Sequence, residues 1–384
     1  MANFPKNLQR MLTKRHKENA FRKLDSKPML VDFSSNDYLG FSRENAISKM
    51  AREIMVSEKV RQNGATGSRL LSGNHKFYTA LEDYLSEYHK AEATLVFNSG
   101  YDANLGFFST VPQKGDIVLY DEFCHASIRD GIQLSRAKSY KFRHNSMDDL
   151  ARKLDLLFKK SQHTESEIYV STESVFSMDG DSPDLNVLAP FCQEHGLHLV
   201  VDEAHALGVF STGKIGVLGL ENEVFARIIT FGKGLGVHGA AILGSPHLKD
   251  FLVNFCRSFV YTTGLPPHTL AAILSGYHFL ESEHGLQAVA RLKGNISHFK
   301  KIVLENGLGS NFIESDSAIQ SCIVEGNEKV KFLSRNLEEN GFDVRPILSP
   351  TVPKGSERLR FCLHAFNTKE EIMTALEVVK KNLV

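Results

Sequence analysis

Residues 197–233 read LHLVVDEAHALGVFSTGKIGVLGLENEVFARIITFGK. This stretch contains two short apolar runs, of which the first is closed by Asp202 and the second by Lys233. The two residues are 233 − 202 = 31 positions apart, about the length of one strand-helix-strand unit. Two neighbouring strands would therefore deliver Asp202 and Lys233 to the same edge of a sheet.

The same pattern extends over residues 46–285, where helix-like stretches alternate with short apolar runs. This alternation is typical of an α/β domain with a mainly parallel sheet covered by helices. Such sheets bind ligands beyond the carboxyl ends of their strands, and polar residues directly follow several of these runs. We therefore expect one ligand site at that edge. The predicted strands are 93–97, 117–120, 168–171, 197–201, 228–231 and 240–243.

The length of 384 residues exceeds what one hydrophobic core usually supports, so two domains are expected. We predict a large domain over residues 46–285 and a smaller α+β C-terminal domain over residues 286–384. Residues 1–45 are predicted to be an N-terminal docking segment that packs with the small domain.

The N-terminal segment begins with a basic stretch in which Leu8, Met11 and Leu12 have helical spacing. An organelle transit peptide would also be basic and amphipathic, but Glu18 and Asp25 interrupt this run. We therefore favour a docking helix with an exposed charged face.

Composition excludes several classes of function. Lys and Arg number 45, as do Asp and Glu, and no block of like charges occurs, which argues against a nucleic-acid partner. The five cysteines are scattered without a Cys-x-x-Cys pair, which predicts a reducing, cytoplasmic location and no metal site. No apolar run approaches the roughly 18 residues of a membrane span. A small-molecule substrate is the remaining expectation.

Asp202 and Lys233 are the pair that pyridoxal phosphate (PLP) chemistry requires. A lysine amine forms a Schiff base with the cofactor, and an acid keeps the pyridine nitrogen protonated so that the ring can accept electrons. Alone, an aspartate or lysine at a strand end is more often a helix cap or a solvated charge. Their combination at one edge favours PLP as the cofactor, with Lys233 as its attachment point.

Other polar residues follow the predicted strands. Ser99-Gly100-Tyr101 precedes a helix-like stretch, where free backbone N–H groups and a glycine suit a phosphate, although an ordinary turn would look the same. The imidazole of His125 could stack on a cofactor ring, although a single histidine is more often structural. His205 follows Asp202 by three positions and could reach a ring oxygen.

A nucleotide-driven motor is a rival interpretation of the same stretch. DEAH at 202–205 is also a Walker B sequence, and GVFSTGK at 208–214 nearly matches a phosphate-binding loop. However, Ile215 replaces the magnesium-binding Ser or Thr, the two motifs come in the wrong order, and no strand separates them. The glycines at 232, 234 and 236 also lack dinucleotide-binding spacing, so we interpret them as room for cofactor and substrate.

The ordered motifs of the chain resemble those of the α-oxoamine synthases, which have the aspartate-aminotransferase-like fold type I of PLP enzymes. Within this family the chain is most similar to the 8-amino-7-oxononanoate synthases of biotin biosynthesis. The family motifs are NDYLG at 36–40, GSRL at 67–70, HAS at 125–127, VFSMDGD at 175–181, DEAH at 202–205 and TFGKG at 230–234. The narrower likeness rests on GAA at 239–241, YTTGLPP at 261–267, SAIQ at 317–320 and PTVPKG at 350–355.

The resemblance implies a role for each matching residue around the cofactor. Lys233 would carry PLP and move the substrate's α-proton, Asp202 would hold the pyridinium, and His125 would stack on the ring. Ser177 and His205 would meet the ring oxygen. The residues implied for the phosphate are Ser99, Gly100, Tyr101 and Thr230, with Thr262 and Thr263 acting across the interface of a homodimer.

The resemblance also implies the substrates, an amino acid and an acyl thioester. Arg360 would bind the amino-acid carboxylate through its planar fork, while Asn36 and Arg22 would line the entrance. L-alanine and a pimeloyl thioester are expected, carried by coenzyme A or an acyl carrier protein. The alternatives are 2-amino-3-ketobutyrate ligase, serine palmitoyltransferase, 5-aminolevulinate synthase and an inactive scaffold subunit.

The segment Leu348-Ser349-Pro350 departs from the family pattern, because the biotin enzymes often have Arg-Pro-Pro there. That arginine is associated with the distal carboxylate of the acyl chain. Its absence leaves acyl specificity open, with Arg345 as a candidate replacement. Glu173-Ser174 also stands where Glu-Gly is usual, which we regard as minor.

Overall fold

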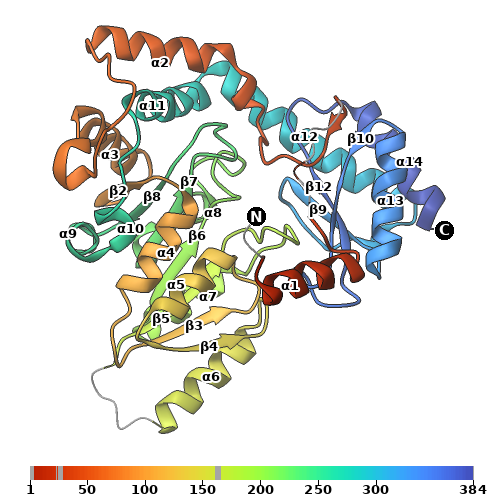
Figure 1. Ribbon diagram of the computed structural model, residues 1–384, viewed down its shortest axis with the longest axis horizontal. Coiled ribbons are helices and arrows are strands. Elements are labelled where there is room, and N and C mark those ends of the chain that lie inside the picture. The colour runs from red at the N-terminus through yellow and green to blue at the C-terminus, as the bar shows by residue number, and fades with distance from the viewer. Residues whose placement is uncertain (1–3, 23, 25–28, 161–165, 384) are drawn as a thin grey trace. The chain divides into compact units, whose positions relative to one another are not determined.

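The computed structural model describes residues 4–22, 24, 29–160 and 166–383 of the chain (Figure 1). These residues divide into two compact units. The large unit comprises residues 36–177 and 181–290, and the small unit comprises residues 1–35, 178–180 and 291–384. Among the described residues, no helix combines the length and apolar composition that crossing a membrane requires.

A seven-stranded sheet forms the centre of the large unit, with strand order β2-β8-β7-β6-β5-β3-β4. Only β8 runs against the others, so the sheet is mainly parallel, as predicted. The strands are β2 (Ala93–Phe97), β3 (Ile117–Asp121), β4 (Lys138–Phe142), β5 (Ile168–Glu173), β6 (His198–Asp202), β7 (Ala226–Thr230) and β8 (Ala240–Gly244).

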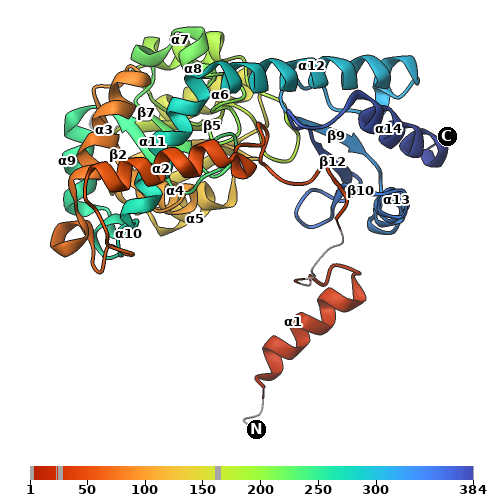
Figure 2. The same ribbon diagram turned by 90° about the horizontal axis from the view of Figure 1, so that it is seen from above.

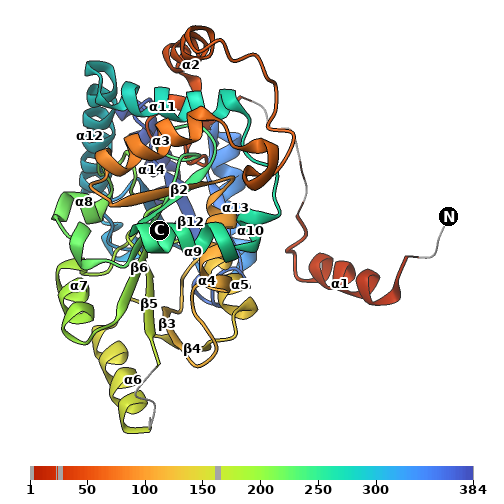
Figure 3. The same ribbon diagram turned by 90° about the vertical axis from the view of Figure 1, so that its left-hand side faces the viewer.

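Alternate side chains along each strand point to opposite faces of the sheet and enter two separate cores. On β3, Val118 joins the core beneath α4 and α5, while Ile117 and Leu119 join the core beneath α6 and α7. Figure 3 shows the strands between these two helix layers. The helices of the large unit are α2 (Asn45–Ser57), α3 (Lys76–Tyr88), α4 (Gly100–Thr110), α5 (Ala126–Leu134), α6 (Met147–Lys160), α7 (Leu185–Glu194), α8 (Lys214–Leu218), α9 (Pro246–Phe255), α10 (Arg257–Val260) and α11 (Pro267–Glu281).

Edge strand β4 is not among the predicted strands. Four of its five residues, KSYKF, are exposed, so the strand contains no apolar run by which it could be predicted. The predicted strand before Lys233 is also displaced, because β7 ends at Thr230 and Lys233 lies three residues further on, in the following loop.

The small unit contains two sheets and two packed helices. In Figure 2, α13 and α14 lie on the same side of β9 and β12. Phe299, Phe312 and Phe361 contact one another in its core. The elements are α1 (Lys6–Lys17), β1 (Val31–Asp32), β9 (Ile319–Ile323), α13 (Asn327–Glu339), β10 (Phe342–Asp343), β11 (Arg345–Ile347), β12 (Arg358–Cys362) and α14 (Lys369–Leu383), and the division between units falls within α12 (Glu283–Glu305).

Candidate active site

A cavity of about 280 Å³ lies at the carboxyl edge of the seven-stranded sheet. Parallel strands end together at this edge, so their terminal residues and following loops share one space. The start of antiparallel β8 adds Gly239 to the same wall. The predicted site residues that line the cavity are Asn36, Ser99, Gly100, Tyr101, His125, Asp202, His205, Thr230 and Lys233.

Asp202 is the last residue of β6 and is buried. Its Oδ1 accepts a hydrogen bond from the backbone N–H of Ala204 at 2.8 Å, and its Oδ2 accepts from Asn104 Nδ2 at 2.7 Å. A carboxylate oxygen has two acceptor sites, so each oxygen keeps capacity for a further donor. Asp202 can therefore bind an N–H group in the cavity.

Lys233 is connected to a chain of hydrogen bonds. Its Nζ lies 2.7 Å from His205 Nε2, and His205 Nδ1 lies 2.6 Å from the hydroxyl oxygen of Tyr38. Tyr38 is fully buried and donates to Asn36 Oδ1 at 3.1 Å. These contacts hold the His205 ring and direct its Nε2 towards the lysine amine.

His125 faces the cavity and caps the N-terminus of α5. Its Nδ1 accepts from the backbone N–H of Ser127 at 3.3 Å and lies 2.7 Å from Ser127 Oγ. Desolvation lowers the pKa of His125, against the attraction of the Asp202 charge. A neutral ring held by one edge presents a flat face to a ligand.

Helix α4 begins at the cavity with Ser99 as its N-cap, and Ser99 Oγ accepts from the N–H of Asp102 at 3.1 Å. A Cβ atom on Gly100 would lie 2.4 Å from Thr230 Cγ2, so glycine is required for this close approach. The remaining N–H groups of the first turn and the helix dipole favour an anion. Tyr101 is half exposed, and its hydroxyl bonds to Asp130.

The other predicted site residues do not line this cavity. Ser177 is buried in the segment after β5. Thr262 Oγ1 and the carbonyl oxygen of Thr263 accept from Asn98 Nδ2 at 3.0 and 2.7 Å. Arg22 and Arg360 belong to the small unit.

The two arginines predicted to bind substrate, Arg22 and Arg360, have different surroundings in the small unit. Arg22 donates to Thr351 Oγ1 at 3.4 Å, and Thr351 follows the departing segment at Leu348 by three positions. Arg360 is buried in the middle strand of a three-stranded sheet, opposite Arg345 on β11.

Glu173 is a cavity residue that the sequence analysis did not select. It ends β5, directly beside Asp202 in the register of the sheet, and is buried. Its Oε1 accepts from the backbone N–H of His125 at 2.6 Å. Burial, followed by the negative charge of Asp202, raises the pKa of Glu173 well above its usual value. Of the two adjacent carboxyl groups, Glu173 is therefore the one whose charged form is disfavoured.

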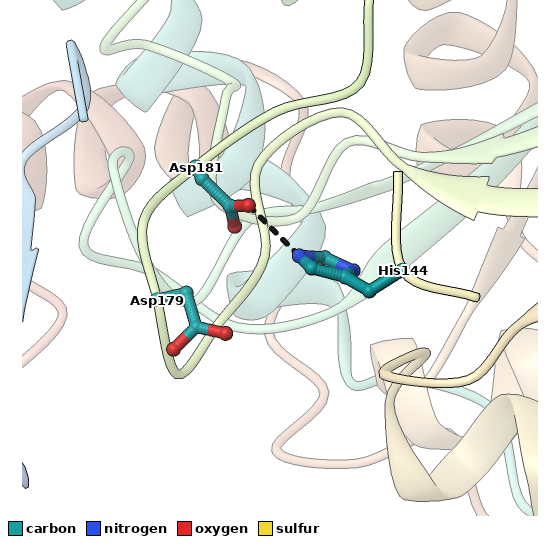
Figure 4. A group of neighbouring side chains, drawn as sticks. All are labelled: His144, Asp179 and Asp181. Atoms are coloured by element: carbon teal, nitrogen blue, oxygen red, sulfur yellow. Dashed lines mark hydrogen bonds and ion pairs between the residues drawn. The ribbon is translucent and has the colours of Figure 1, made fainter. Parts of the chain in front are cut away.

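His144 is not among the residues that line the cavity, and its ring points towards Asp181 (Figure 4). Its Nδ1 is 2.9 Å from Asp121 Oδ1, and its Nε2 is 2.8 Å from Asp181 Oδ2. Although burial opposes the charge, these two carboxylates raise the pKa of His144 to about 9. A protonated His144 therefore ties the end of β3 to the segment after β5, in which the N–H of Phe176 donates to the Asp181 carbonyl.

Known proteins share both the sequence and the fold of the chain. A family model of aminotransferase class I and II matches residues 28–379. The 8-amino-7-oxononanoate synthase of Emericella nidulans is 38% identical over 388 residues, which cover 97% of this chain and 94% of that protein. The chain belongs to the aminotransferase class I and II family. Within that family it is an α-oxoamine synthase, as its motifs predicted.

Solved structures agree with this assignment. The crystal structure of 8-amino-7-oxononanoate synthase from Francisella tularensis has a TM-score of 0.75 and 28% identity, and covers 92% of this chain and 98% of its own. A serine palmitoyltransferase variant from S. paucimobilis, with bound PLP and myriocin, has a TM-score of 0.84 and 26% identity and covers 98% and 96%. The chain has fold type I and is a PLP-dependent acyltransferase.

The cavity of this α-oxoamine synthase fits PLP, its cofactor. A lysine amine is available for the aldehyde, a carboxylate with spare acceptor capacity suits the pyridinium N–H, and a helix N-terminus with a required glycine suits the phosphate. These groups come from separate strand ends that the sheet brings to one edge.

Proposed function

We propose that the chain condenses L-alanine with a pimeloyl thioester to give 8-amino-7-oxononanoate. The new bond joins the α-carbon of alanine to the thioester carbonyl carbon, the C–S bond breaks, and the alanine carboxyl group leaves as CO2. The supporting observation is sequence similarity, because an 8-amino-7-oxononanoate synthase is 38% identical over almost the whole chain.

The residues of the cavity would hold the cofactor as follows. Lys233 would bond to its aldehyde carbon, the Asp202 carboxylate would accept from its pyridinium nitrogen, and the face of His125 would cover its ring. Ser99, Gly100, Tyr101 and Thr230 would hold the phosphate at the start of α4. His205 would meet the ring oxygen with Ser177.

PLP, when bound, draws electrons away from the α-carbon of an attached amino acid. Asp202 would sustain this withdrawal by keeping the pyridine nitrogen protonated. The Lys233 amine would take the α-proton of alanine as a general base and return it to the product. His205 Nε2, 2.7 Å from that amine, would orient it.

Arg360 and Arg22 would bind the two ends of the substrates. The guanidinium of Arg360 offers the paired N–H donors that suit the carboxylate of alanine. Arg22 would pair with the distal carboxylate of the pimeloyl chain, because Leu348 supplies no charge and an unpaired desolvated carboxylate is unfavourable. Arg345 is less suited, since it already pairs with Asp343 at 3.5 Å.

We also propose a homodimer in which Thr262 and Thr263 act on the phosphate in the partner's cavity. In support, neither residue lines the cavity of its own chain, and Asn98 holds both in place. Hybrid dimers of a Lys233→Ala subunit with a Thr262→Ala/Thr263→Ala subunit should regain activity through one intact site. Inactive hybrids after verified subunit exchange would contradict a shared site.

A substrate panel tests the proposed reaction. Purified protein is incubated with glycine, L-alanine or L-serine and with acetyl, pimeloyl or palmitoyl coenzyme A, or pimeloyl acyl carrier protein, and products are identified by mass. Alanine with a pimeloyl donor should give the highest kcat/KM. Preference for serine with palmitoyl or glycine with acetyl thioester would assign a sister activity, and no product from any pair would favour the inactive scaffold.

The acyl end has its own test. Arg22→Ala should raise KM for the pimeloyl donor at least about tenfold, with little change for an uncharged acyl donor of equal length, which is the pattern of a lost binding contact. Arg345→Ala is the matched control. An equal rise in KM for both donors would exclude a charge contact at Arg22.

A further inference from the structure

Asn104 lies on α4 four residues after Gly100, so both residues occupy one face of the helix. The first turn of α4 borders the cavity, and Asn104 continues that border one turn deeper. We propose that Asn104 is a positioning residue that fixes Asp202 and His125 in one arrangement for the cofactor. This inference rests on the roles proposed above for those two residues.

The Asn104 side chain connects the acid to the histidine by consecutive hydrogen bonds. Its Nδ2 donates to Asp202 Oδ2 at 2.7 Å and to Ser127 Oγ at 3.1 Å. Ser127 Oγ in turn lies 2.7 Å from His125 Nδ1. Asn104 and Ser127 are buried, so water does not compete for these bonds. One amide thus links the carboxylate that would bind the pyridinium to the histidine that would cover the ring.

The orientation of this amide is fixed by charge. If the group were rotated by half a turn, Asn104 Oδ1 would face the Asp202 carboxylate, and two acceptors would repel each other. In the observed orientation, Oδ1 has no hydrogen-bond partner among the described residues. A buried carbonyl without a partner is unfavourable, and an apolar side chain of similar size would avoid it. The fold therefore tolerates the unpaired Asn104 carbonyl at the position where the Asn104 amide donates to Asp202 and Ser127.

The donors also favour one location for the negative charge. Asp202 and Glu173 are neighbours in the sheet, and two adjacent carboxyl groups resist ionising together. Asp202 receives a donor on each oxygen, from Asn104 and from the N–H of Ala204. Hydrogen bonds to an ionised carboxylate stabilise its charged form. Asn104 thereby helps to keep the charge on the carboxyl group that would meet the pyridinium.

Cofactor binding and the cofactor spectrum, measured without substrates, test this role. Asn104→Leu removes both donors at similar size, and Asn104→Ala does so at smaller size in case leucine impairs folding. Both variants should bind PLP at least about tenfold more weakly, as expected for losing a hydrogen bond to a charged group. The pH midpoint of the visible band should also shift. Asn295→Leu, which removes a buried amide of the small unit, is the matched control and should bind PLP as the wild type does.

An Asp202→Asn background tests whether the effect of Asn104 on PLP binding depends on Asp202. Because the bond to the Asp202 charge carries most of the expected effect and the link to His125 the smaller part, adding Asn104→Leu there should change PLP affinity by less than about threefold. A full additional loss in that background, or wild-type affinity and pH midpoint in both single variants, would overturn the inference. If Asp202→Asn itself leaves the spectrum unchanged, the proposed role of Asp202 fails instead. Circular dichroism establishes that each variant is folded.

Discussion

Two cavities border the seven-stranded sheet, one at the carboxyl edge, where the parallel strands end, and one at the amino edge, where β2 and β7 begin. Their volumes are similar, about 280 Å³ at the carboxyl edge and about 240 Å³ at the amino edge. At the amino edge the buried Arg227 has three polar partners. It bonds to Glu203 Oε2 at 2.7 Å and donates to the carbonyl oxygens of His89 and Thr212 at 3.1 and 2.6 Å. Its charge is therefore paired with a buried carboxylate of the protein itself.

The carboxyl edge has the opposite character. Asp202 and Glu173 lie side by side, Lys233 contacts a histidine, and the start of α4 presents backbone donors. These polar groups line the cavity, where they can bind a ligand. Cavity size therefore does not distinguish the two edges of this sheet, whereas the pairing of their buried charged groups does: Arg227 is paired with Glu203 at one edge, and the carboxyl groups of Asp202 and Glu173 adjoin at the other.

The largest effect on function is expected from Lys233→Ala. The cofactor would lose its covalent attachment and the reaction its base, so turnover should fall by more than about a thousandfold while the fold persists. Steady-state kinetics and circular dichroism measure the two quantities. Lys249→Ala, which breaks an ion pair with Glu82 elsewhere in the large unit, should retain turnover as the control.

Asp202→Asn should lower kcat by about a hundredfold to a thousandfold, the scale of losing one preorganised electrostatic contact. The substitution keeps the size of the side chain but removes the charge that holds the pyridinium proton. Rates at saturating alanine and thioester are the measurement. A near-normal rate would show that catalysis at the carboxyl edge does not depend on the charge of Asp202.

Arg227→Met tests the amino edge, where the expected effect is on stability. It leaves the Glu203 carboxylate buried without its cation, which should lower the free energy of unfolding by about 3–5 kcal/mol. Adding Glu203→Gln should restore part of that loss. Urea unfolding measures both. If Arg227→Met instead removed activity without loss of stability, the contrast between the two cavities would not hold.

The smallest effect concerns His144 and pH. Its pKa is raised from 6.5 to about 9, so its stabilising contribution is complete below pH 6.5 and is lost as pH rises through about 9. The difference in unfolding free energy between wild type and His144→Gln should be on the order of 1 kcal/mol at pH 6, since the ring is partly exposed. That difference should shrink by pH 10. A difference constant over this range would indicate that His144 is uncharged.

Much of this site could be predicted from sequence because strand ends are marked there. An apolar run followed by Asp202 or by Ser99-Gly100 locates both a strand and its carboxyl edge. Asn104 and Tyr38 could not be selected in this way, because their roles depend on which residues pack against them. Glu173 does follow the predicted strand 168–171 with Thr172, but its role beside Asp202 depends on the pairing of β5 with β6. The spacing of Asn104 four residues after Gly100 was the available signal, since it puts both residues on one helix face.

The fold shows the same limit. The strands β2, β5 and β6 were predicted to within two residues at either end because each contains a short run of buried apolar residues. Edge strand β4 has mostly exposed side chains and is defined by pairing with β3, a long-range contact that its own residues do not reveal. The substrate-binding roles proposed for Arg22 and Arg360 rest on family resemblance alone.

The most direct test of the account is to locate the covalent bond to the cofactor. Borohydride reduction of the PLP-loaded protein, followed by proteolysis and mass spectrometry, identifies the modified lysine. The account predicts the label on Lys233, with none on Lys214 or Lys249 of the same unit. A label on another lysine, with Lys233 unmodified, would contradict the central claim that the carboxyl edge of this sheet carries the cofactor through Lys233.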